Sequence, residues 1–209
     1  MLATITLTCA PLDSFPAPDS RAEALAALDD PVAENRAEAV GWLAIHGGMP
    51  DQALLVRRLR DESPLVRGFA EQGLWLLWSR SGDAALDRVM AAGIEYMQDG
   101  RHKEAIAAFS EVIRRRPAFA EGWNKRATVY YLAGDYPRSL ADCGEVMKRN
   151  PYHFGALSGY GQIHFRQENY EKAIEYWRRA LEVNPNMVGV ELNIRGAEQL
   201  LREKRARSI

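Results

Sequence analysis

The second half of the chain carries a pattern of small, aromatic and apolar residues that recurs about every 34 residues. Shifting the sequence by this period superposes five columns across three units without an insertion. The columns are Gly93, Ala127 and Gly161; Tyr96, Tyr130 and His164; Ala105, Ser139 and Ala173; Phe109, Cys143 and Trp177; and Pro117, Pro151 and Pro185. A fixed period of this kind is typical of stacked helical units that share a continuous core.

Each unit is predicted to be a pair of helices, A and B. Small residues in two columns let the helices approach closely, and the aromatic columns fill the space between them. The proline column ends helix B, because a residue before proline avoids the α region. Turns are expected at Asp99-Gly100, Gly134-Asp135 and Glu168-Asn169. The pattern predicts helix pairs over 86–116, 120–149 and 154–183, with no β-sheet, and a buried Cys143.

Residues 186–209 are predicted to form a helix that covers the last repeat, because the end of a stacked array must hide its apolar side from water. The apolar residues spaced along one face of this helix are Val190, Ile194, Ala197 and Leu201. Its basic residues are interpreted as solvated charges that favour a helix C-terminus, in preference to a nucleic-acid site. They are Arg202, Lys204, Arg205 and Arg207.

Residues 20–82 also have a helical pattern, but the repeat columns of the second half are absent there. Instead, LDDPVAENRAEAVGWLA roughly repeats as LRDESPLVRGFAEQGLWLL, with an Asp, a following proline, an Arg six residues after the Asp and an apolar helix face. Asp30 and Asp61 are expected to cap helices, with Arg36 and Arg67 on the following turns.

The pattern of the second half resembles the tetratricopeptide repeat, and the resemblance covers residues 84–185. Val89 and Leu157 depart from the family pattern, because a Trp is common at their positions and only Trp123 supplies it. Cys143 and His164 also replace usual aromatics. The first half resembles a pair of HEAT-type hairpins, as in phycobilisome-lyase-like repeats. Together the resemblances imply an all-α fold, a continuous right-handed α-solenoid of helical hairpins with a capping helix.

Residues 1–19 are expected to be a flexible tail or the remnant of a leader, since PLDSFPAPDS reads as a linker. A secretory signal would add a positive start and a longer apolar core. The second half is similar to small bacterial tetratricopeptide proteins that are often exported, which favours the periplasm over the cytoplasm. Cys9 and Cys143 lie far apart without a metal spacing, and a buried thiol is the preferred interpretation of Cys143.

Composition argues against several classes of partner. The chain has 209 residues, 27 basic against 28 acidic side chains and a formal net charge of -1. Nucleic acids and membrane surfaces are usually bound by concentrated positive charge, so neither is expected here. No apolar run approaches the roughly 18 residues of a membrane span.

No catalytic constellation is found in the sequence. The four histidines are scattered, and HExxH, paired cysteines and Gly-rich phosphate loops are all missing. We therefore predict a protein that is not an enzyme and that needs no cofactor or metal.

The tetratricopeptide resemblance implies that helices A line a concave groove for a peptide or partner helix. Carried onto this chain, the groove residues are Met90, Ile94, Met97, Asn124, Lys125, Thr128, Tyr131, Ser158, Gln162 and Phe165. Its amides suit an extended backbone, and its apolar side chains offer pockets. Because Tyr131 follows the core-facing Tyr130, the 100° step of a helix is expected to turn Tyr131 towards the groove.

Chaperone-binding members of this family hold an acidic C-terminus with a clamp of lysine, asparagine and arginine. The matching positions here are Met90, Ile94, Lys125, Gly155 and Gly159. Only Lys125 has a suitable charge, so such a clamp is not expected.

The expected function is that of a scaffold or adaptor for a protein partner, with the oligomeric state left open. One alternative is a nucleic-acid-binding HEAT adaptor, which would use Arg57, Arg58, Arg60 and Arg67 with Trp75 and Trp78. A second alternative is a non-catalytic regulatory subunit of an enzyme complex.

Overall fold

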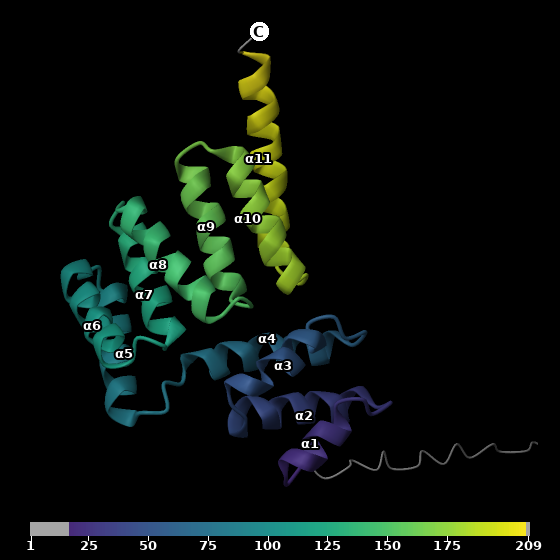
Figure 1. Ribbon diagram of the computed structural model, residues 1–209. Helices are drawn as coiled ribbons and strands as arrows, with labels where there is room; N and C mark the ends of the chain where they lie inside the picture. Colours follow the sequence, from purple (N-terminus) through teal and green to yellow (C-terminus); the bar gives the residue numbers. More distant parts are fainter. Residues whose placement is uncertain (1–16, 208–209) are drawn as a thin grey trace, which may run out of the picture.

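The computed structural model describes residues 17–207, and this span is entirely helical (Figure 1). It contains eleven α-helices and one 3-10 helix, without a strand in that span, which confirms the all-α class. The elements are α1 Arg21–Ala27, α2 Ala33–His46, η1 Met49–Asp51, α3 Gln52–Arg58, α4 Pro64–Ser79, α5 Ala84–Gln98, α6 His102–Arg115, α7 Ala120–Leu132, α8 Tyr136–Arg149, α9 Phe154–Arg166, α10 Tyr170–Val183 and α11 Val188–Ala206. Cys9 and residues 1–16 of the predicted tail lie outside the described residues.

The three predicted helix pairs are confirmed as α5/α6, α7/α8 and α9/α10. Each pair turns through one residue in the left-handed region, at φ 72° for Gly100, 77° for Gly134 and 56° for Glu168. These residues are spaced by the repeat period, so the backbone keeps the same turn where the third repeat has no glycine. Left-handed φ values favour glycine, so Glu168 holds a conformation that costs free energy.

The size of the residues in two columns is matched within each repeat. A methyl group on Gly93 would lie 2.6 Å from Phe109 Cε1, and one on Gly161 would lie 2.3 Å from Trp177 Cδ1. The middle repeat has Ala127 in the glycine column and Cys143 in the aromatic column. Cys143 is buried as predicted, and this burial raises the pKa of its thiol to about 12.

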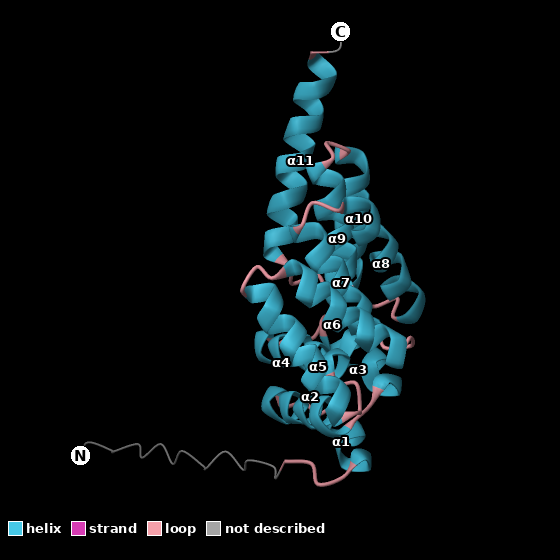
Figure 2. Cartoon of the chain, turned by 90° about the vertical axis from the view of Figure 1, so that its left-hand side faces the viewer, coloured by secondary structure: helices cyan, strands magenta, loops and turns pink. Residues whose placement is uncertain are grey.

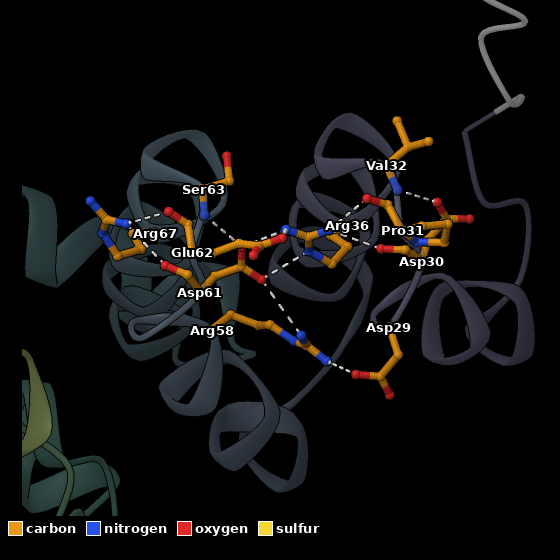
Figure 3. Close-up of polar contacts among 10 residues, drawn as sticks. All are labelled: Asp29, Asp30, Pro31, Val32, Arg36, Arg58, Asp61, Glu62, Ser63 and Arg67. Atoms are coloured by element: carbon orange, nitrogen blue, oxygen red, sulfur yellow. Dashed lines mark hydrogen bonds and ion pairs between the residues drawn. The ribbon is translucent and has the colours of Figure 1, made fainter.

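In the first half, α2 packs along α4, and α1 and α3 lie against them. The two motifs seen in the sequence have the same hydrogen bonds (Figure 3). Asp30 Oδ1 accepts from the Val32 amide, as Asp61 Oδ1 does from Ser63. The aspartates therefore bind the residues at which α2 and α4 are capped, Val32 and Ser63, and are not themselves the N-cap residues that we expected.

The arginines of the two motifs also correspond. Arg36 Nη1 donates to the carbonyls of residues 30 and 31, and Arg67 Nη1 donates to those of residues 61 and 62. Arg36 also donates two hydrogen bonds to the Asp61 carboxylate, from Nε at 2.9 Å and from Nη2 at 2.7 Å. This buried bidentate pair joins the first motif to the second.

The two halves of the chain do not continue as one stack, which corrects the expected continuity of the solenoid. Helix α4 runs across the ends of the later repeats instead of along α5 (Figure 1). Its Trp78 stacks on His153 with ring centroids 4.6 Å apart, and Trp75 meets Phe154 edge-on. Asn186 Nδ2 donates to the Leu59 carbonyl at 2.7 Å, which joins the α10–α11 turn to the end of α3.

At the other end, α11 packs against α10 and buries Val190, Ile194 and Ala197. The helix extends beyond the rest of the molecule (Figures 1 and 2).

Candidate functional site

The candidate groove lies on the A helices α5, α7 and α9. Viewed as in Figure 2, α4 and α11 lie on one side of the molecule and α8 on the other. Met97, Tyr131 and Phe165 occupy the same position in the three repeats and are half-buried. Ile94, Thr128 and Gln162 form the next such row and are also half-buried.

Met90 does not belong to this surface. It is 4% exposed and packs in a core cluster with Leu86, Phe109, Val112 and Val129. A flexible thioether fills the space between the first and second repeats. We therefore remove Met90 from the expected groove.

The neighbouring tyrosines of α7 have different environments. Tyr130 is only 7% exposed, whereas Tyr131 is half-buried and its hydroxyl accepts a hydrogen bond from Arg166 Nε at 3.2 Å. The ring of Tyr131 packs on Tyr136, with centroids 5.9 Å apart. Tyr131 thus connects α7 to α9.

Phe165 packs against two aromatic side chains of α10. Its ring lies 5.6 Å from the rings of Trp177 and Tyr170. The Thr128 hydroxyl donates to the Asn124 carbonyl at 3.0 Å, so this hydroxyl is satisfied within its own helix. Ser158 contributes its carbonyl to Trp177 Nε1.

A buried carboxylate that sequence reasoning missed, Glu121, lies in the first turn of α7. Glu121 is 2% exposed and accepts from His153 Nε2 at 3.0 Å and from Asn124 Nδ2 at 3.0 Å. Lys125 Nζ lies 3.1 Å from Glu121 Oε1. Two expected groove donors, Asn124 and Lys125, are therefore already engaged.

The imidazole of His153 has a defined hydrogen-bonding arrangement. Its Nδ1 accepts from the Ala156 amide at 3.1 Å, so the ring proton lies on Nε2 and is donated to Glu121. Burial by itself would raise the pKa of Glu121, but the hydrogen bond from His153, together with the hydrogen bond and charge of Lys125, holds it below its usual value. In the sequence, the four-residue spacing from Glu121 to Lys125 could have indicated their ion pair, whereas nothing indicated that Glu121 is buried.

The residues of the nucleic-acid alternative are largely used within the protein. Arg58 pairs with aspartates, and Arg60 and Arg67 donate to backbone carbonyls. Trp78 is buried, and Trp75 packs edge-on against α9. Arg57, the remaining residue of this set, is exposed.

The family comparison bears directly on this groove. Two tetratricopeptide repeat models match the chain, over residues 90–146 and 154–187. These segments are tetratricopeptide repeats.

Similar proteins share the tetratricopeptide region. A TPR repeat-containing protein of Rhizobium etli is 34% identical over 126 residues, which cover 60% of this chain and 62% of that protein. Hsp70-Hsp90 organizing protein 1 of Glycine max is 28% identical over 100 residues, which cover 48% of this chain and 18% of that protein. The matches thus span less than two thirds of either relative.

Solved structures show the same fold. The first TPR domain of Spaghetti, bound to the HSP90 peptide SRMEEVD, superposes with a TM-score of 0.54 at 23% identity, covering 56% of this chain and 93% of that one. The Sgt2 TPR domain from Aspergillus fumigatus gives a TM-score of 0.56 at 18% identity, covering 59% of this chain and 83% of that one. At these identities the likeness concerns the fold alone.

Within residues 17–207, no helix combines the length and apolar character needed to cross a membrane. Over the same span, His, Cys, Asp and Glu side chains do not gather in groups of three suited to a metal ion.

Proposed function

We propose that this chain is a scaffold or adaptor whose tetratricopeptide repeats bind a peptide segment or helix of a partner protein. The observation that carries the proposal is the row of Met97, Tyr131 and Phe165, which presents a half-buried apolar side chain at the same position of three successive A helices. Such a row suits a ligand with apolar side chains at regular intervals. Tetratricopeptide proteins are generally non-catalytic, and we propose the same here.

The ligand is proposed to be uncharged or apolar at the centre of the groove. Asn124 and Lys125 are already bound to Glu121, so a ligand carboxylate placed there would have to compete with Glu121 for both donors. The HSP90 peptide SRMEEVD, which the Spaghetti domain binds, is therefore expected not to bind this chain.

The first half is proposed to be a HEAT-like pair. Support comes from the identical hydrogen bonds of Asp30 and Asp61, and of Arg36 and Arg67, at equivalent positions of the two motifs. By docking across the repeats, this pair would hold the groove in one curvature.

The test uses the two adjacent tyrosines. A partner is first identified by affinity purification from the native organism with mass spectrometry, and its binding segment is then titrated. Tyr131→Ala is expected to weaken binding by about 1 kcal/mol or more, since tyrosines are frequent among dominant interface residues. Its melting temperature is expected to fall far less than that of Tyr130→Ala, because Tyr131 is only half-buried. Tyr130→Ala is expected to cost about 3 to 5 kcal/mol of stability.

Tyr152→Ala is the matched control, because Tyr152 is exposed in the turn before α9. It should change neither stability nor binding. Full affinity of Tyr131→Ala for the partner, or tight binding of SRMEEVD, would show that the groove is not the working surface proposed here.

A further inference from the structure

The first half of the chain presents a second exposed surface, on the neighbouring helices α2 and α4. On α4, Leu65, Phe69 and Leu76 are 44%, 42% and 43% exposed, and Ile45 on α2 is 55% exposed. Large apolar side chains that are exposed together on one face mark interaction sites more often than single ones do.

These residues occupy equivalent positions of the two motifs. Adding 31 to the α2 residues Glu34, Glu38, Gly41 and Ile45 gives the α4 residues Leu65, Phe69, Gln72 and Leu76. The spacing of four, three and four residues keeps each set on one face of its helix. A methyl group on Gly41 would lie 3.5 Å from Phe69 Cδ1, so the two faces adjoin. They form one surface, which we call the α2–α4 face.

The surface is apolar along α4 and at the end of α2, and it is acidic at the start of α2. Glu34 and Glu38 are exposed, and neither forms an ion pair with any described residue. The arginines of the same helices point elsewhere: Arg36 is buried against Asp61, and Arg67 donates to backbone carbonyls. The carboxylates are therefore not neutralised from α2 or α4.

A cavity of about 360 Å³ adjoins the acidic end. Its lining includes three acids, Glu23, Asp30 and Glu38, and no basic residue. Pro18, Ala26 and Ala27 supply an apolar wall. An acidic mouth over apolar walls suits the long stem and charged head of a lysine or arginine side chain.

We propose that the α2–α4 face binds a basic amphipathic segment of a partner protein. Its apolar residues would lie over Phe69, Ile45 and Leu76, and a lysine or arginine would enter the cavity beside Glu38. Charge complementarity selects this occupant, because the same carboxylates repel nucleic acid and anionic lipid. The inference is independent of the tetratricopeptide groove, since the two surfaces share no residue.

The probe is a synthetic helical peptide of leucine and lysine, labelled for fluorescence anisotropy and titrated with the full chain at about 0.15 M salt, where exposed charges are screened beyond roughly 8 Å. Glu38→Lys and Phe69→Ser are each expected to weaken its binding at least about tenfold, which exceeds the effect of most interface residues. Because Glu38 is exposed, Glu38→Lys is expected to leave the fold intact. It therefore remains decisive if Phe69→Ser lowers stability by exposing Gly41.

Two controls separate this surface from general stickiness. A peptide with glutamate in place of lysine should not bind, and Tyr131→Ala, in the other groove, should bind the lysine peptide like the parent. Equal binding of both peptides, or unchanged affinity in Glu38→Lys, overturns the proposal. Sedimentation showing a dimer that Phe69→Ser dissociates would assign the α2–α4 face to a second copy of the chain, and would also overturn it.

Discussion

The size match between Gly93 on α5 and Phe109 on α6 makes a quantitative prediction. In Gly93→Ala the new methyl carbon would lie 2.6 Å from Phe109 Cε1 and 2.9 Å from Cζ, whereas carbon atoms prefer about 3.5–4.0 Å. Phe109 is fully buried, so its ring cannot move into solvent. Overpacking costs up to about 3 kcal/mol, and alanine in place of a helical glycine returns about 1 kcal/mol. We expect a net loss of about 2 kcal/mol.

The middle repeat suggests the compensating change. It combines Ala127 with Cys143, so Phe109→Cys should make room for alanine at position 93. Phe109→Cys alone is expected to cost about 3 kcal/mol through the cavity it leaves. In that background Gly93→Ala should be stabilising by about 1 kcal/mol. The coupling energy between the two positions is then about 3 kcal/mol.

The parent, both single variants and the double variant are unfolded with urea, and unfolding is monitored by circular dichroism. Their free energies of unfolding are compared, provided that their m-values are equal. Gly196→Ala is the control, because nothing lies within 4 Å of the methyl position on this α11 glycine. It should gain about 1 kcal/mol. If Gly93→Ala has the same effect with Phe109 and with cysteine at position 109, the two columns are not matched by size.

Two further predictions concern the polar motif and the turns. The hydrogen bond from Arg36 lowers the pKa of Asp61, so this group contributes stability above its unfolded pKa of about 3.9, and the contribution is lost as pH falls through the lower folded value. Asp61→Asn is expected to cost about 3–5 kcal/mol of stability at pH 7. In acid, the free energy of unfolding of this variant should fall less steeply with decreasing pH than that of the parent. An equally steep fall in both proteins would contradict this. Glu168→Gly, which supplies the residue that Gly100 and Gly134 have at this turn, is expected to gain about 1 kcal/mol in urea unfolding. A loss of stability would show that the Glu168 side chain matters more than its backbone.

Sequence alone determined the repeats and their internal packing. The contact between Gly93 and Phe109 is local in sequence, and its equivalent between Gly161 and Trp177 recurs two repeat periods later. Because each repeat contacts only its neighbours, and does so in the same way, the spacing of residues in the sequence is enough to predict which residues are in contact. The helix pairs and the burial of Tyr130 and Cys143 therefore followed from the columns.

Sequence could indicate the surface of the A helices but not which groups on it are free. Met90 looks like Ile94 and Met97 in the pattern, yet it fills the space between two repeats. Lys125 lies four residues after Glu121, which is an ordinary pair on a solvated helix surface. Only the fold shows that this glutamate is buried and bound to His153. Exposure and charge depend on neighbours that periodicity does not specify.

Only the tertiary structure decided how the two halves meet. Leu59 and Asn186 are 127 residues apart and share a hydrogen bond, and Trp78 stacks on His153 across a junction that follows neither repeat period. The α2–α4 face likewise emerged from the packing of α2 on α4. Such contacts depend on the shapes of side chains that are brought together from distant segments. A repeat pattern in the sequence predicts only the contacts within a repeat and between adjacent repeats.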